Sequence, residues 1–427
     1  MSEWKESELN KIGTVVSGGT PSTAVAEFWN GDILFVTPFD LSRSKSAFIE
    51  NTERKISKEG LINSSANLLP AGSIIISSRA PIGYIAVATK DFTTNQGCKS
   101  IVPNSDFDSL YFYYCLNFYV ERIKRLGAGS TFSEISKRDL ELVKFPHPKD
   151  KTEQRHISRI LSTADSVIEK TQAAIAKYKA IKHGMLYDLF TRGIDLQTGK
   201  LRPKYEDAPE LYKESKLGMV PKGWEEKPLE ELTTQIGDGI HTTPKYSENT
   251  DFYFINGNNL SDGEILIGSA LCVREEEYKK HFKELNTRTI LYSINGTIGN
   301  IAIYKNEKVI LGKSACYISC KQNVNLDYLF FILQTFPIQK FYELEMTGST
   351  IKNLSLASVR NTPIAIPKDD KEQELIAEII RTINNKLHTE QNYLHKLQQL
   401  KAGLMGDLLS GRKKVKVNKG ALTQAVD

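Results

Sequence analysis

Two long stretches of the chain carry hydrophobic residues at alternating spacings of four and three. They begin near residues 150 and 369 and sustain this spacing over about five heptads, with Ile and Leu at most seam positions. Such a pattern predicts two long helices that pair in a coiled coil. The residues expected at the centre of the packing are Ile168, Ile175, Leu387 and Leu394.

Both stretches are bounded by residues that favour helix ends. Asp150 stands three positions before Glu153, and Asp369 stands three positions before Glu372. This spacing predicts a capping box at each N-terminus. Glycines that follow the last seam residues predict the C-terminal stops, at Gly193 and Gly411.

Two further glycines lie inside the predicted helices, at Gly184 and Gly403. A glycine in a helix interior costs ~1 kcal/mol relative to alanine. We hypothesise that the pair permits close approach of another backbone, in which case replacing both with leucine disrupts assembly. A tolerated surface glycine is the alternative.

The segments before the two helices contain short runs of β-branched and aromatic residues bounded by Gly, Asn and Ser, a pattern typical of strands. Two aromatic-rich segments, residues 108–126 and 326–344, predict one helix each, with the aromatic side chains in the core. Each globular part is therefore predicted to be α+β and mostly β.

The whole pattern occurs twice. PKDKTEQRHI (148–157) recurs as PKDDKEQELI (367–376) at an offset of 219, and SIIISSRAPIGYIAV (73–87) resembles TILYSINGTIGNIAI (289–303) at 216. Cys98 aligns with Cys316 at an offset of 218. The offset drifts only in the front part of each unit, and loops absorb insertions that packed helices do not. The sequence therefore predicts two repeats, each a variable domain followed by a rigid helix.

These boundaries divide the chain into six parts. They are a first domain (1–148), a first helix (149–193), a linker (194–223), a second domain (224–367), a second helix (368–411) and a basic tail (412–427). The linker is long enough for the helices to run antiparallel, which would relate the repeats by a pseudo-twofold axis. At ~40 residues each helix would span about 60 Å and act as a ruler between the domains.

Composition adds few constraints. The chain has 427 residues, 40% hydrophobic, and its net charge of +5 neither establishes nor excludes a nucleic-acid partner. Its five cysteines fit free thiols in a reducing cytoplasm. No apolar run reaches the ~20 residues of a membrane span, and the polar N-terminus does not resemble a signal peptide. A cytoplasmic chain without a membrane partner is expected.

No motif carries catalytic chemistry. LGKSA (311–315) lacks the glycine that a phosphate-binding loop requires, because Glu307 stands in its place. Cys316 and Cys320 have no second Cys/His pair at zinc spacing, and NTPI (361–364) is only a faint echo of an amino-methyltransferase loop. The sequence predicts a binding protein with no catalytic residues, no metal and no cofactor of its own.

Several motifs stand out in the two units. They are SGGTPST (17–23), GDILFVTPFDL (31–41), LPAGSIIISSRAPIGYIAV (69–87), TTNQGCKSIVP (93–103), GAGSTFSEISKRDLELVKFPHP (127–148), PKGWEEKPLEEL (221–232) and TGSTIKNLSLASVRNTPIAIP (347–367). With these motifs, the repeated alternation of variable domain and long helix resembles the specificity (S) subunit of type I restriction–modification enzymes. The resemblance covers nearly the whole chain and departs at two loops of the second unit, IGDGIHTTPKY (236–246) and GKSAC (312–316).

The resemblance implies two target-recognition domains that together read a bipartite, gapped site on double-stranded DNA. It also implies that the helices dock two methyltransferase (M) subunits, which two restriction/motor (R) subunits join. Those partners would bring S-adenosylmethionine, ATP and Mg²⁺. The M subunit would flip an adenine out of the stack to methylate it.

Polar and basic loop residues are the candidate DNA contacts, since Arg and Lys can read guanine, Asn and Gln can read adenine, and Ser and Thr commonly hold phosphates. Turns need the same residue types, which is the structural alternative for each. The candidates are Thr20, Ser22, Arg79, Gln96, Lys99, Ser130 and Thr131 in the first unit and His241, Thr242, Lys245, Asn295, Lys313, Ser349, Thr350 and Lys352 in the second. The tail, residues 411–419, is a candidate for a non-specific DNA or partner contact.

Two other classes of protein stay open at this point. One is a self-contained DNA methyltransferase or nuclease chain, which the missing cofactor turn and missing acidic metal motif disfavour. The other is a structural coiled-coil scaffold, which the two strand-rich domains disfavour.

Overall fold

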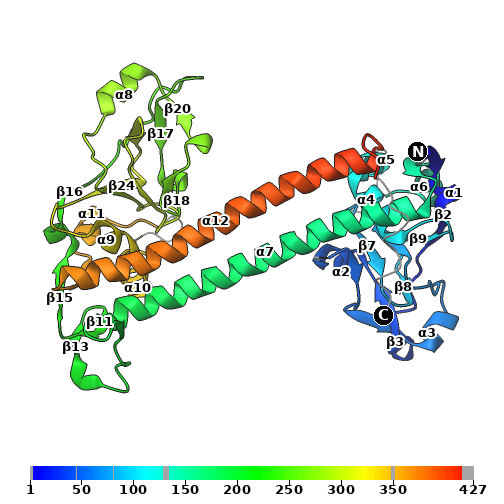
Figure 1. Ribbon diagram of the computed structural model, residues 1–427, viewed down its shortest axis with the longest axis horizontal. Coiled ribbons are helices and arrows are strands. Elements are labelled where there is room, and N and C mark those ends of the chain that lie inside the picture. The colour runs from blue at the N-terminus through cyan, green and yellow to red at the C-terminus, as the bar shows by residue number, and fades with distance from the viewer. Residues whose placement is uncertain (1–2, 45, 80, 128–133, 348–351, 416–427) are drawn as a thin grey trace. The chain divides into compact units, whose positions relative to one another are not determined.

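The computed structural model describes residues 3–44, 46–79, 81–127, 134–347 and 352–415 (Figure 1). The chain divides into two compact units. Unit 1 contains residues 1–173 and 392–427, and unit 2 contains residues 174–391. Each unit therefore combines one globular domain with the beginning of one long helix and the end of the other.

The two long helices are α7 (Lys151–Arg192, 42 residues) and α12 (Asp370–Leu409, 40 residues). None of the seam positions predicted from the heptads is exposed. Within unit 1 the start of α7 shares a core with the end of α12, and within unit 2 the end of α7 shares a core with the start of α12. The helices consequently run antiparallel in both units, as the sequence predicts (Figure 1).

The observed ends of the two long helices agree with the predicted caps only in part. Asp150 and Asp369 each accept a hydrogen bond at 2.8 Å from the backbone N–H two residues later. The glutamates of the predicted capping boxes do not reach back to the caps; they are buried and bind elsewhere, so this part of the prediction is wrong. Gly193 and Gly411 have φ values of +63° and +74°, which confirms both C-terminal stops.

The domain of unit 1 is mostly β. A five-stranded sheet has the order β2-β9-β6-β7-β4, and a three-stranded sheet has the order β5-β3-β8. The strands are β1 (Trp4–Glu8), β2 (Gly13–Ser17), β3 (Trp29–Val36), β4 (Phe48–Ile49), β5 (Arg54–Ile56), β6 (Ile74–Ser77), β7 (Ile85–Ala88), β8 (Phe92–Thr94), β9 (Cys98–Pro103) and β10 (Lys144–Pro148), of which β1 and β10 form a separate ladder. The helices are α1 (Leu9–Ile12), α2 (Pro38–Arg43), α3 (Lys58–Ile62), α4 (Ser109–Phe118), α5 (Val120–Leu126), α6 (Lys137–Glu141) and a 3₁₀ turn at Ala26–Phe28.

The domain of unit 2 repeats this plan. Its larger sheet has the order β16-β24-β21-β22, and its smaller sheet has the order β20-β17-β23. The strands are β15 (Trp224–Pro228), β16 (Thr233–Asp238), β17 (Tyr253–Ile255), β18 (Leu260–Ser261), β19 (Glu264–Ile265), β20 (Leu271–Cys272), β21 (Thr289–Ser293), β22 (Ile301–Ile303), β23 (Val309–Leu311), β24 (Ala315–Cys320) and β25 (Pro363–Pro367). The helices are α8 (Glu275–His281), α9 (Leu326–Ile332), α10 (Phe336–Glu345) and α11 (Leu356–Arg360), with 3₁₀ turns at Leu229–Leu232, Gly257–Asn259 and Ile267–Ser269.

The sheet registers define which residues of the two domains correspond. Ser77 ends β6 and Ser293 ends β21, and each hydroxyl accepts a backbone N–H from seven residues further on. Cys98 pairs with Ser77, whereas Ala315 pairs with Ser293. Cys98 therefore corresponds to Ala315, and Lys99 corresponds to Cys316. The predicted alignment of Cys98 with Cys316 is one residue out of register.

The two aromatic-rich segments each form two helices instead of the single helix predicted. In the first unit α4 ends at Phe118 and α5 begins at Val120. In the second unit Pro337 stands in the first turn of α10, where its missing N–H costs nothing, and it ends the preceding helix. The aromatic side chains lie in the core as expected, with Tyr111, Tyr114 and Tyr328 at 0–1% exposure.

The segment predicted as a linker folds into two hairpins. They are β11 (Ile194–Asp195) with β12 (Lys200–Leu201) and β13 (Tyr212–Ser215) with β14 (Gly218–Pro221), separated by a 3₁₀ turn at Pro209–Leu211. Ile194 and Val220 are buried in the same core as Trp224 of β15. These apolar residues attach a largely polar segment to unit 2. Among the described residues no helix combines the length and apolar character of a membrane span.

Candidate nucleic-acid interface

In unit 1, loops from distant parts of the sequence meet beside the ends of β2, β6 and β9. We call residues 18–22, 78–79, 95–99 and 134–135 loop cluster 1. The backbone N–H groups of Ser78 and Arg79 donate to the carbonyl of Gly97 at 2.8 and 3.3 Å. Ile135 donates to the carbonyl of Ser78 at 2.9 Å. These bonds fix three loops to one another.

Loop cluster 1 brings four predicted contacts together. Thr20 Oγ1 donates to Gln96 Oε1 at 2.6 Å. Arg79 Nε binds Glu134 Oε2 at 2.9 Å, and Lys99 Nζ lies 3.5 Å from Glu134 Oε1. One carboxylate thus holds two cations, of which the Arg79 side chain is 55% exposed and the Lys99 side chain only 7%. Arg79 is the cation that a ligand can reach.

Ser22 lies beside this group and is exposed. Its carbonyl accepts a hydrogen bond at 3.1 Å from the indole N–H of Trp29, which holds the loop against the domain. Ser130 and Thr131 lie outside the described residues.

Unit 2 has the same arrangement of loops. We call residues 238–242, 294–296, 312–314 and 352–354 loop cluster 2. Ile294 donates to the carbonyl of Ser314 at 3.0 Å, and Leu354 donates to the carbonyl of Ile294 at 2.8 Å. These bonds correspond to those between Ser78 and Gly97 and between Ile135 and Ser78. The two clusters therefore share one backbone scaffold.

The side chains on that scaffold differ. Asn295 occupies the place of Arg79, and its Nδ2 donates to Asn353 Oδ1 at 3.0 Å. Asn353 occupies the place of Glu134, and both pairs form isolated antiparallel β-bridges. The ion pair of cluster 1 is thus an amide pair in cluster 2.

The other predicted contacts of unit 2 that the structure describes lie on the loops of cluster 2, apart from Lys245, which follows Thr242 in the chain. His241 Nε2 lies 2.8 Å from Asp238 Oδ2. Lys313 is exposed, and its backbone N–H donates to Ile240. Lys352 is exposed, and its carbonyl accepts from Gly296. Thr242 and Lys245 are exposed on the loop after β16, and Ser349 and Thr350 lie outside the described residues.

Glu134 and Asn353 are not among the contacts predicted from the sequence. An acidic residue such as Glu134 is not expected where a phosphate backbone binds. The repeat contained the signal, because these residues correspond at the offset of 219 that holds from the GST motifs onward. Their different chemistry at one position marks them as variable residues on a constant frame.

The comparisons with known proteins decide the family. A family model described as the type I restriction modification DNA specificity domain matches residues 1–177 and 221–399. The chain belongs to this family of type I restriction–modification specificity subunits. It is a specificity subunit and not an enzyme in its own right.

Individual relatives agree. The specificity subunit of the MjaIX type I restriction enzyme from Methanocaldococcus jannaschii is 28% identical over 421 residues, which are 97% of this chain and 94% of that protein. The EcoR124I/EcoR124II specificity subunit from Escherichia coli is 32% identical over 175 residues, 39% of this chain and 41% of that protein. The S subunit of a type I system from M. genitalium has the same fold, with a TM-score of 0.58 at 16% identity over 98% of this chain and 97% of that chain.

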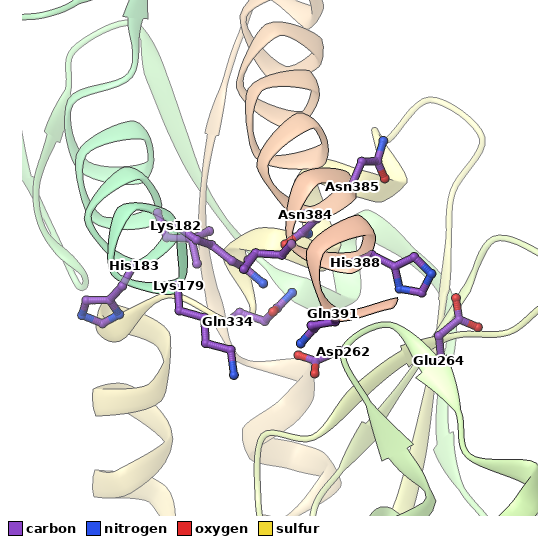
Figure 2. Close-up of a pocket in the computed structure, with 12 residues that line it drawn as sticks. Lys179, Lys182, His183, Asp262, Glu264, Gln334, Asn384, Asn385, His388 and Gln391 are labelled. Carbon is purple, nitrogen blue, oxygen red and sulfur yellow. The ribbon is translucent and has the colours of Figure 1, made fainter. Parts of the chain in front are cut away.

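The helix pair of this specificity subunit contains polar breaks in its seam. In unit 1, Lys401 forms an ion pair with Asp165, which also accepts a hydrogen bond from Tyr114 at 2.7 Å. In unit 2 the corresponding lysine is Lys182, and Asn384 replaces Asp165 (Figure 2). Burial lowers the pKa of Lys182, and the charge of Lys179 contributes in the same direction, whereas Asp262 opposes the shift.

Lys182 lies at a pocket of about 560 Å³ in unit 2 (Figure 2). The pocket lies between the helix pair and the turn from β18 to β19, which contributes Asp262 and Glu264. Its residues are Lys179, Lys182, His183, Leu186, Asp262, Glu264, Gln334, Asn384, Asn385, Leu387, His388 and Gln391. The lining mixes acids, bases and amides, which are side chains suited to polar contacts.

The predicted packing residues of the helices have two kinds of environment. Ile175 and Leu387 are 8% exposed, and Ile168 and Leu394 are partly buried in the seam. A Cβ added to Gly184 or Gly403 would meet no atom of the described chain within 4 Å. The described chain therefore provides no backbone that approaches these glycines, and the hypothesis of close packing there now concerns a partner protein.

The cysteines are free thiols, and Cys98, Cys115, Cys316 and Cys320 are buried. Burial raises the pKa of Cys115 and Cys320 to about 12, so neither is a ready nucleophile or thiolate ligand. In the described part of the chain, no three His, Cys, Asp or Glu side chains group as a metal site would require.

Proposed function

We propose that this specificity subunit reads a bipartite, gapped site on double-stranded DNA, with loop cluster 1 on one half-site and loop cluster 2 on the other. The observation that carries the proposal is that the two clusters share one backbone scaffold but differ in the residues of its isolated β-bridge. The bridge joins Arg79 and Glu134 in cluster 1 and Asn295 and Asn353 in cluster 2. Arginine presents a bidentate donor suited to guanine, and asparagine pairs with adenine. Two readers of different preference on one frame suit an asymmetric site.

The chemistry of the exposed residues supports this role. The side chains available to a nucleic acid are cations, hydroxyls and amides, which serve phosphate and base contacts. The exposed ones are Ser22, Arg79 and Gln96 in unit 1 and His241, Thr242, Lys245, Lys313 and Lys352 in unit 2, and the half-buried Thr20 and Asn295 complete the set. Because Lys99 is buried behind Glu134, we assign it to holding that carboxylate in place.

Tethering explains why two domains are used. A mismatched base pair costs ~1–3 kcal/mol, so a short half-site discriminates poorly alone. Joining two readers makes the second contact intramolecular and multiplies the selectivity. In this proposal α7 and α12 together set the distance between the readers.

We further propose that the helices dock two methyltransferase subunits and that two restriction subunits join the complex. The open surface at Gly184 and Gly403 and the polar pocket around Lys182 are the surfaces that such partners could use. S-adenosylmethionine, ATP and Mg²⁺ would then be bound by the partners, and the complex would act in the cytoplasm on genomic DNA.

Matched insertions test the ruler. Seven residues inserted after both Ala173 and Gln391 keep the heptad pattern of each helix and add about 10.5 Å, or about three base pairs, to their length. We expect the methylated sites of the reconstituted complex to keep both half-sites and to lengthen the gap. An insertion in only one helix is the control, since it disrupts the pairing and should abolish activity. A gap of unchanged length, or a changed half-site, would refute the proposal.

A further inference from the structure

Arg79 is bound to Glu134 through only one of its guanidinium nitrogens. Its Nε lies 2.9 Å from Glu134 Oε2, and its Nη groups have no acceptor among the described residues. The side chain is 55% exposed. Because the guanidinium group is planar and rigid, a bond that fixes Nε also limits the directions in which the Nη groups point. The free edge of Arg79 can therefore meet an acceptor outside the protein in a defined orientation.

The carboxylate that binds Arg79 is itself held from the interior of the domain. Lys99 Nζ lies 3.5 Å from Glu134 Oε1, and the Lys99 side chain is 7% exposed. A cation buried to this extent is stable in the folded chain only when an anion pairs with it. The backbone of Glu134 is also fixed, because it forms an isolated β-bridge with Arg79. The bridge and the buried cation together determine the position of the carboxylate.

A carboxylate at a DNA-binding surface needs an explanation, because it carries the same charge as the phosphates. Glu134 is 31% exposed, so solvent or a ligand can reach it. Its negative charge is compensated by Arg79 on one side and by Lys99 on the other. The three side chains together are net positive, and the carboxylate therefore orients Arg79 without making the surface negative.

The second repeat differs at all three positions together. Asn295 and Asn353 form the corresponding bridge, and Cys316 occupies the place of Lys99. Cys316 is buried, and burial raises the pKa of its thiol, which is therefore uncharged at neutral pH. The cation behind the bridge is thus absent where the carboxylate is absent. This is the result expected if the role of Lys99 is to hold Glu134.

The neutral bridge holds its own recognition residue in a similar manner. Asn353 Oδ1 accepts a hydrogen bond at 3.0 Å from Asn295 Nδ2. The bond leaves one N–H and the Oδ1 of Asn295 without a partner among the described residues. These are the two groups with which an asparagine side chain pairs with adenine. In both clusters, the bridge partner binds one part of a side chain and leaves the part suited to a base free.

We propose that Glu134 is a positioning residue for Arg79, and that Lys99 and Glu134 together orient the free guanidinium edge toward a guanine. This role rests on the proposed function, since it requires loop cluster 1 to meet DNA bases. An arginine that is held before DNA arrives loses less conformational freedom on binding than one that is not held. Glu134 therefore strengthens the guanine contact through Arg79 and makes no base contact of its own.

Two double variants of the full chain separate positioning from stability. Lys99→Met with Glu134→Ala, the alanine pair, removes the carboxylate and leaves no buried charge unpaired. Lys99→Met with Glu134→Gln, the glutamine pair, keeps a neutral acceptor for Arg79 Nε. Because both pairs lack the same buried ion pair, a difference between them does not arise from its loss.

The probes are a duplex with the site that the parent complex methylates and duplexes in which each base pair of the two half-sites is replaced in turn. Fluorescence anisotropy with the reconstituted complex gives the discrimination at each position, which is the ratio of the affinities for the parent and the replaced duplex. Arg79→Ala identifies the position that Arg79 reads, because discrimination should fall there alone.

At that position the alanine pair should lose about 3–10-fold of the discrimination, the effect of one side chain that must be immobilised on binding. The glutamine pair should retain it. In an Arg79→Ala background the alanine pair should lose no further discrimination, because its effect passes through Arg79. The matched control is Asn353→Ala, at the same bridge position of cluster 2, which should leave the discrimination at this position unchanged.

The positioning role of Glu134 is refuted if the alanine pair discriminates like the parent, or if it loses as much in the Arg79→Ala background. Equal losses in the alanine and glutamine pairs also refute it, since an acceptor for Arg79 Nε would then be irrelevant. If Arg79→Ala changes discrimination at no position, the proposed function of loop cluster 1 fails together with this role. A loss in Arg79→Ala without a loss in the alanine pair refutes the role of Glu134 alone.

Discussion

Loop clusters 1 and 2 occupy the same position in their domains and hold different chemistry there. Cluster 1 places Arg79 and Lys99 on the carboxylate of Glu134, whereas cluster 2 pairs Asn295 with Asn353. The supporting backbone bonds correspond one to one. The repeat has therefore kept the frame and changed the side chains that the frame presents.

This difference teaches how one fold can serve several specificities. Recognition residues lie on loops whose positions a rigid sheet determines, so the contacts can vary without a change of core. The ion pair and the amide pair also predict different responses to salt, because only the former involves net charge. The predictions below separate the two clusters on that basis.

The largest effect is expected from removing Arg79 and Asn295, the bridge residues that the proposal assigns to base contacts. Arg79→Ala and Asn295→Ala should each weaken specific DNA binding by the reconstituted complex by about 5–150-fold, the value of a bidentate base contact of ~1–3 kcal/mol. Fluorescence anisotropy at several salt concentrations measures both. Arg79→Ala should also reduce the slope of the logarithm of DNA affinity against the logarithm of salt concentration by about one. Asn295→Ala should leave this slope unchanged.

Thr52→Ala is a control from the same unit for these measurements. Thr52 lies outside loop cluster 1, where its half-buried hydroxyl donates to the carbonyl of Arg54 at 2.6 Å and accepts from the backbone N–H of Phe35 at 3.3 Å. If both substitutions changed the salt dependence of DNA binding equally, this would contradict the assignment of a charged contact to cluster 1 and a neutral contact to cluster 2.

A smaller effect is expected from the residues that hold the bridges. Glu134→Ala leaves Lys99 buried without its anion and should lower the free energy of unfolding by about 2 kcal/mol. Asn353→Ala removes one neutral hydrogen bond and should cost about 1 kcal/mol. Urea denaturation measures both free energies of unfolding. A larger loss of unfolding free energy for Asn353→Ala than for Glu134→Ala would contradict this difference between the two bridges.

The heptad pattern predicted the two long helices well, because it repeats every seven residues along the chain. Every seam position is at least partly buried, and both terminal glycines adopt the left-handed conformation. The capping boxes failed for a tertiary reason. Glu153 and Glu372 have the right spacing, but the indoles of Trp4 and Trp224 bind them from elsewhere in the chain.

The candidate interface could be predicted only as loops of suitable residue types. Contacts such as Thr20 with Gln96 join residues 76 positions apart, and no periodicity encodes them. The one-residue error between Cys98 and Cys316 arose because the connection from β22 to β23 is one residue longer than that from β7 to β8. Register is decided by the sheet, which a single sequence does not display.

The smallest effect concerns the lysines in the helix seam. Asp165→Asn removes the ion pair with Lys401 and should cost about 1 kcal/mol, whereas Asn384→Asp gives Lys182 an anion and should add about 0.5 kcal/mol. Thermal unfolding at neutral pH measures both. A loss of stability in Asn384→Asp would contradict the interpretation that Lys182 lacks the kind of anion that Asp165 provides for Lys401.

The pH dependence of Lys182 has a definite sign. Its pKa is lowered in the folded chain, so the unfolded chain binds the proton more strongly. Folding with Lys182 protonated therefore costs free energy. This cost is fully present below the pKa of the folded chain and disappears as the pH rises through the ordinary lysine value of about 10.4. Lys182→Met should therefore be more stable than the parent at neutral pH, and this advantage should vanish at high pH.

The most direct measurement is the map of methylated adenines made by the complex that contains Asn295→Ala with Asn353→Ala, beside that of the parent. The account predicts that base preference relaxes at positions within one half-site, while the other half-site and the gap stay the same. Relaxation in both half-sites, or a changed gap, would contradict the claim that each loop cluster reads its own half of the site.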